Sequence, residues 1–137
     1  MLSETRLIFF HKQSNSARTR FLRFEHGIIG FSPLPSDAVV RSAAEEVVRA
    51  HPAALINDAA QRLSLPVDAL CPLGEFYAEV ESGEQVIPVL LIQFTAIDPP
   101  FDAVEAVGGR FVSITETRRL PAAELELLRR AYEVLIG

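Results

Sequence analysis

Cysteine is almost absent from this chain, and the single residue, Cys71, excludes an internal disulfide framework. One thiol also cannot form a zinc site unless histidines supply the remaining ligands. A chain without disulfides suits a reducing compartment, so we expect a cytoplasmic location. The N-terminal sequence MLSETRLIFFHK lacks the basic-then-apolar layout of a signal peptide, which agrees with that expectation.

Long hydrophobic runs are also missing. The longest nearly apolar segment, 86–94, has nine residues and is interrupted by Pro88 and Gln93. A helix that crosses a bilayer needs about 20 predominantly apolar residues in a row. We therefore expect no membrane partner.

Positive charge is scarce, with 13 Lys and Arg residues against 18 Asp and Glu residues. It is unevenly spread, because residues 1–32 have a net charge of +3 and the remainder has −8. A polynucleotide-binding protein usually needs a larger basic surplus, since phosphate neutralisation supplies most of its affinity. The charge balance therefore favours a small anionic ligand, held by a local basic cluster, over a nucleic-acid partner.

The residues that are present describe one α/β domain spanning 1–137. Hydrophobic residues make up 49% of the chain and charged residues 23%, which suits a folded domain with a buried core. Strand-like and helix-like periodicities alternate, which favours a mixed sheet between helical layers. The predicted strands cover 6–12, 19–31, 75–81, 86–96 and 110–115, and the predicted helices cover 36–49, 53–63, 102–107 and 121–136.

Segments 75–81 and 86–96 form the clearest predicted hairpin. The apolar residues of EFYAEVE are expected to face the core and its glutamates to face solvent, with Ser82-Gly83 as the turn. The returning strand lacks alternation, so we expect it to be covered on both faces. Pro88 within it indicates an edge or a bulge, and an exposed edge can support a homodimer.

The segment 27–49, GIIGFSPLPSDAVVRSAAEEVVR, joins a glycine-led loop to the predicted helix over 36–49. Its spacing resembles the signature of the Nudix family: a glycine, five residues, a glutamate, seven residues, then Arg-Glu-apolar-x-Glu-Glu-x-Gly-apolar. The residues that match are Gly27, Arg41, Glu45 and Glu46. The residues that depart from the signature are Pro33 and Ser42, which replace glutamates, Val48, which replaces the last glycine, and Arg49.

The similarity extends beyond the signature. The segment VEAVGGRFVSITE resembles a late segment of the family, with Glu105, Phe111 and Glu116 at the matching positions. Together these resemblances imply a Nudix-like α/β/α sandwich with a mixed sheet.

The resemblance also implies a chemistry, the magnesium-dependent hydrolysis of nucleoside diphosphate derivatives. Magnesium takes oxygen ligands and activates the attacking water. By analogy with the family, Glu45, Glu46 and Glu105 are the candidate metal ligands and catalytic acids, and Arg41 orients the acids.

The missing glutamates favour a second interpretation, in which the domain is catalytically impaired and binds a nucleotide-like ligand or a protein partner. The active hydrolase remains an alternative, so enzyme activity stays open. A third possibility is a non-Nudix α+β interaction domain. Taken alone, Arg41, Glu45 and Arg49 also fit an i, i+4 ladder on a solvated helix.

Arg20, Arg23 and Gly27 are the candidate ligand-binding residues. Phe21 and Phe24 alternate with the arginines and are expected to face the core, which leaves the arginines near a ligand phosphate. Single-stranded nucleic acid is the competing ligand, but stacking of bases would require the same phenylalanine rings to be exposed.

Overall fold

A computed structural model describes residues 5–14, 16, 18–42 and 52–136 of the chain. Its centre is one mixed sheet of seven strands in the order β3-β5-β6-β1-β2-β7, with β4 pairing with β6 off this path. The strands are β1 (Arg6–Lys12), β2 (Thr19–Arg23), β3 (Val39–Val40), β4 (Leu70–Pro72), β5 (Ala78–Ser82), β6 (Gln85–Phe94) and β7 (Arg110–Val112). The helices are α1 (Ala53–Leu63), α2 (Phe101–Ala106) and α3 (Ala122–Ile136), with 3₁₀ turns η1 (Val67–Ala69) and η2 (Ile114–Glu116).

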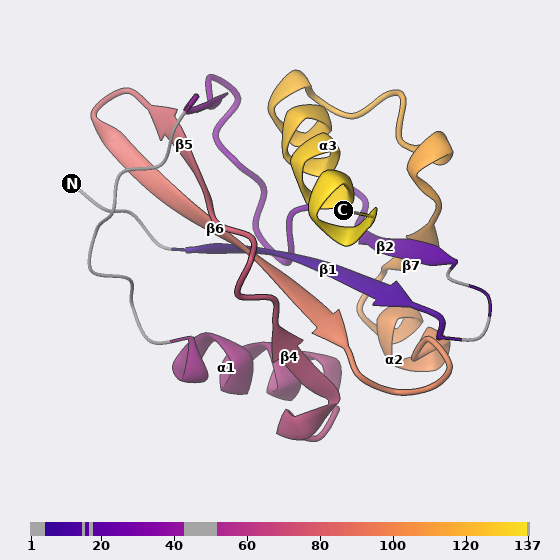
Figure 1. Ribbon diagram of the computed structural model, residues 1–137. Helices are drawn as coiled ribbons and strands as arrows, with labels where there is room; N and C mark the ends of the chain where they lie inside the picture. Colours follow the sequence, from indigo (N-terminus) through magenta and orange to yellow (C-terminus); the bar gives the residue numbers. More distant parts are fainter. Residues whose placement is uncertain (1–4, 15, 17, 43–51, 137) are drawn as a thin grey trace.

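Helices cover both faces of the sheet, with α3 on one face and α1 and α2 on the other (Figure 1). The central strand β1 runs parallel to β6 and is buried on both faces. Because successive side chains alternate, Ile8 and Phe10 pack with α3, whereas Leu7 and Phe9 pack with α1. The chain is thus an α/β protein with a mixed sheet and two apolar layers.

The predicted hairpin is confirmed as β5 and β6. Its turn lies one residue later than expected, at Gly83 and Glu84, because Ser82 already pairs with Gln85. Gly83 has a φ of +59°, which glycine adopts at no steric cost. Pro88 does not mark a sheet edge, because β6 lies between β5 and β1; it is tolerated there because the pairing with β1 begins only at Val89.

The helix predicted over 36–49 is wrong for its described part. Val39 and Val40 instead form strand β3, which pairs with β5 at the edge of the sheet. Arg41 continues the extended pairing, since its N–H donates to the Glu79 carbonyl at 2.9 Å. Two β-branched valines beside an open sheet edge favour the strand, and this tertiary pairing outweighs the helical spacing. Residues 43–49 of the predicted helix lie outside the described residues.

The later helices are confirmed with small changes. Helix α1 has the predicted bounds, and α3 begins one residue after Pro121. The buried face of α3 contains Glu124, Leu127, Leu128 and Ala131, whereas Leu125 is exposed. No helix in the described ranges is both long and apolar enough to cross a membrane.

Candidate anion-binding site

An open cavity of about 330 Å³ lies at the β7 edge of the sheet and is lined mainly by arginine side chains. We call it the arginine cavity and define it by Arg23, Arg110, Arg118, Arg119, Thr115 and Glu116.

Strand pairing positions the first two arginines. Arg23 is the last residue of β2 and Arg110 the first residue of β7, and the antiparallel register places them directly opposite each other. The alternation of each strand puts both side chains on the same face as Phe21 and Val112, which pack with α3. Like charges directly opposite each other destabilise a strand pair, so an anion between them would stabilise it.

The turn that follows η2 brings in the other two arginines. Ser113 caps the start of η2 with a capping box, in which its backbone N–H donates to Glu116 at 2.9 Å; its hydroxyl also donates to Glu116, at 3.0 Å. The Thr117 hydroxyl then donates to the Ile114 carbonyl at 2.5 Å. These bonds fix the backbone immediately before Arg118 and Arg119, so the turn presents both side chains at the cavity.

None of the four cavity arginines forms an ion pair or hydrogen bond through its side chain within the described residues. Several arginines elsewhere in the same ranges do have partners, such as Arg41 with Glu79 and Glu81, and Arg62 with Asp58. Unpaired positive charge therefore gathers at one place in a protein whose net charge is −5.

Glu116 is the one acidic residue that lines the cavity, and its carboxylate already accepts hydrogen bonds. The hydrogen bond from the Ser113 backbone N–H, with a second from the Ser113 hydroxyl, lowers the pKa of the Glu116 carboxyl. The charges of Arg110 and Arg18 act in the same direction. Glu116 thus stays ionised, yet it cannot neutralise four guanidinium groups, which remain charged at any physiological pH.

Of the three predicted ligand residues, only Arg23 reaches this cavity. Arg20 lies on the other face of the sheet, because an odd spacing along a strand places two side chains on opposite faces. There its guanidinium sits over the Phe101 ring, 5.8 Å from the centroid, and donates to Gln13 at 2.9 Å.

Gly27 does not line the cavity either; its role is to allow a close approach to α3. Its φ is +139°, and a Cβ at this position would lie 2.1 Å from Glu124 Oε1. The same carboxylate oxygen accepts the Ile28 N–H at 2.7 Å. The absence of a side chain at Gly27 therefore lets a buried glutamate of α3 hold the loop that follows β2.

Burial raises the pKa of the Glu124 carboxyl, which is 3% exposed. The Ile28 hydrogen bond opposes this shift, as do the charges of His26 and Arg23. The helical pattern of the sequence did not predict that Glu124 is buried, because glutamate is rarely buried.

The predicted magnesium ligands are not brought together in the described part of the chain. Glu45 and Glu46 lie outside the described residues, and Glu105 is exposed on α2. Arg41 follows β3, whereas α2 packs against β7 at the opposite edge of the sheet. The described ranges contain no group of three or more potential metal ligands.

Arg110, Arg118 and Arg119 were not predicted as ligand-binding residues, because the sequence concentrates its net positive charge within residues 1–32. The available signal was the Arg-Arg pair at 118–119 within the acidic remainder of the chain. Counting charges along the sequence could not show that this pair lies near Arg23, because the two segments are brought together only by strand pairing.

No protein-family model matches the sequence, and no curated protein matches it. The evidence on function is therefore the geometry of the arginine cavity.

Proposed function

We propose that this protein is a Nudix-like α/β domain that binds a phosphate-bearing, nucleotide-like small molecule in the arginine cavity, with little or no hydrolytic activity. The observation that carries the proposal is the set of four arginines without partners around one opening. Arginine presents a planar fork of N–H donors that matches phosphate oxygens in pairs. A phosphate between Arg23 and Arg110 would also relieve the repulsion across β2 and β7.

A small ligand fits better than a polynucleotide. Phe21 and Phe24, the aromatic residues nearest the basic stretch, are buried in the core, so bases cannot stack on them. The rest of the surface carries the acidic surplus of the chain, which would repel a long phosphate backbone. A compact phosphate group needs only the local cluster.

Weak catalysis is the expectation from the incomplete motif. Pro33 and Ser42 stand where the family has carboxylates, and each loss removes negative charge that would hold magnesium. This part of the proposal depends on the resemblance to the Nudix family, whereas the anion site depends on the cavity geometry.

Calorimetric titration with pyrophosphate, ADP and adenosine tests the anion site. We expect binding of the two phosphate compounds and none of adenosine. Arg110→Gln and Arg118→Gln should each weaken ADP binding about tenfold, as expected for losing a hydrogen bond to a charged group. Raising the salt concentration should weaken binding further, because the site is solvent-exposed.

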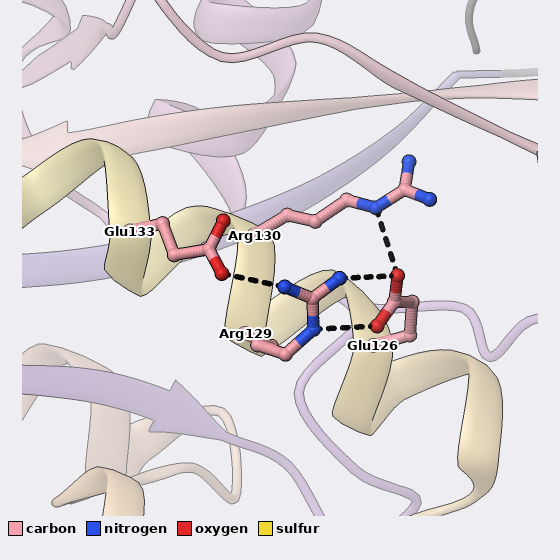
Figure 2. Close-up of polar contacts among 4 residues, drawn as sticks. All are labelled: Glu126, Arg129, Arg130 and Glu133. Atoms are coloured by element: carbon pink, nitrogen blue, oxygen red, sulfur yellow. Dashed lines mark hydrogen bonds and ion pairs between the residues drawn. The ribbon is translucent and has the colours of Figure 1, made fainter. Parts of the chain in front are cut away.

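Arg129→Gln is the matched control. It removes the same charge from the exposed face of α3, where Arg129 is held by Glu126 and Glu133 (Figure 2). This variant should bind ADP like the unmodified protein. Equal ADP affinity in Arg110→Gln, Arg118→Gln and the unmodified protein would refute the assignment of the cavity.

A further inference from the structure

Glu116 places a carboxylate among the four arginines of the cavity. Its Oε1 atom accepts both bonds from Ser113, and its Oε2 atom makes no hydrogen bond within the described residues. An ionised carboxylate can only accept hydrogen bonds. The cavity therefore offers many donors to an anion and one carboxylate acceptor beside them.

This arrangement discriminates between anions. A phosphate ester that carries no hydrogen-bond donor would meet the repulsion of Glu116 with no compensating contact. A phosphate whose attached group carries a hydrogen-bond donor would instead satisfy the free Oε2 atom while the arginines hold the phosphate. A neutral hydroxyl suits this position better than an ammonium group, because the surrounding arginines repel a second cation.

We propose that Glu116 is a specificity-determining residue, which selects phosphate esters that carry a hydroxyl group near the phosphate. The hydroxyl donates to Glu116 Oε2, and the arginines of the cavity bind the phosphate oxygens. This assignment rests on the anion-binding function proposed above and adds to it the chemical class of the ligand.

Two ligands of equal charge test the assignment: glycerol 3-phosphate and n-propyl phosphate, which differ only in two hydroxyl groups. Calorimetry on the unmodified protein should show glycerol 3-phosphate binding about tenfold more tightly, as expected for a hydrogen bond to a charged acceptor. In Glu116→Gln the preference should fall to about twofold or less, while n-propyl phosphate should bind more tightly than before, because the repulsion is gone.

Ser113→Ala is the control for the fold of the turn. It removes the 3.0 Å bond from the hydroxyl to Glu116 but leaves the carboxylate in the cavity. We expect this variant to keep the preference for glycerol 3-phosphate. Loss of the preference in Ser113→Ala together with its retention in Glu116→Gln would assign selectivity to the turn and overturn the proposal.

The outcomes separate this inference from the function on which it rests. If pyrophosphate and both esters fail to bind the unmodified protein, the anion site itself is refuted. If pyrophosphate binds but the two esters bind equally, or neither ester binds, the role of Glu116 is refuted and the anion site stands. Retention of the tenfold preference in Glu116→Gln refutes the role of Glu116 in the same way.

Discussion

Two glutamates interact electrostatically with arginines of the cavity, and their pKa values are shifted in opposite directions. The Ser113 N–H stabilises ionised Glu116, whereas burial disfavours the charge on Glu124. Arg23 contributes to the electrostatics of Glu124 and also lines the cavity. At the scale of single residues, both glutamates accept a backbone N–H, Glu116 at the exposed cavity and Glu124 in the core, where it attaches α3 to the loop that follows β2.

The raised pKa of Glu124 predicts a pH dependence of stability. The folded state holds the proton more tightly than the unfolded state, so the contribution is full below the usual carboxyl pKa of 4.5 and is lost as pH rises through the raised value. Glu124→Gln keeps an acceptor for the Ile28 N–H and cannot ionise. Urea unfolding of both proteins between acidic and neutral pH should show the stability of the variant rising relative to that of the unmodified protein as pH increases.

The control for this comparison is Glu133→Gln, whose carboxylate is exposed on the same helix. It should show no comparable gain as pH rises. A constant difference between Glu124→Gln and the unmodified protein across the pH range would contradict the buried-carboxylate account.

At the scale of elements, β3 is a two-residue strand that a buried ion pair attaches to β5. The Glu79 side chain is fully buried and contacts Arg41 at 3.2 Å, and the Tyr77 hydroxyl donates to Glu79 at 2.8 Å. Glu79 was expected to face solvent because it alternates with the core residues of β5. It is buried instead because Arg41 and Tyr77 cover that face. The alternation therefore predicted the side of the strand on which Glu79 lies, but it did not predict that the side chain is shielded from solvent.

The surface network on α3 also pairs glutamates with arginines, but unlike the pair of Glu79 and Arg41 it lies on the solvent-exposed side of a helix (Figure 2). Hydrogen bonding to Arg129 lowers the pKa of Glu126 to about 2, and Arg130 binds the same carboxylate at 3.0 Å. These groups are solvent-exposed in large part, so water and salt compete with each pair. The network lies on the surface of the helix and adds little to the helix's stability.

We therefore expect different costs for matched charge-removing variants of the two elements. Glu79→Gln should lower the free energy of unfolding by about 2 kcal/mol, because it removes the buried charge that contacts Arg41, which then keeps the exposed Glu81 as a charged partner. Glu126→Gln should cost about 0.3 kcal/mol, and less in high salt. Chemical denaturation at neutral pH measures both; equal costs would mean that burial of Glu79 does not strengthen its pairing with Arg41.

At the scale of the whole molecule, the cavity is assembled from segments that are distant along the chain. Arg23 comes from the basic N-terminal region, and the other arginines come from residues 110–119. The sheet places its candidate anion site at the β7 edge and Arg41 at the β3 edge.

Magnesium-dependent turnover tests the alternative of an active hydrolase. We expect no phosphate or pyrophosphate bond cleavage in sugar nucleotides or dinucleotide polyphosphates with added magnesium, because carboxylates are missing at Pro33 and Ser42. A chromatographic product assay over a day provides the measurement. Turnover that depends on magnesium and is lost in Glu46→Gln would establish the hydrolase and reject the impaired domain.

The sequence by itself determined the elements whose pattern is local: β1, the β5–β6 hairpin, α1 and α3. Hydrophobic periodicity is a property of neighbouring residues, so it predicts these segments without knowledge of their partners. Only the tertiary structure decided that Val39 and Val40 form a strand and that Arg23 meets Arg110, because both depend on pairing between segments far apart in sequence. The register of that pairing, and not the local composition, creates the arginine cavity.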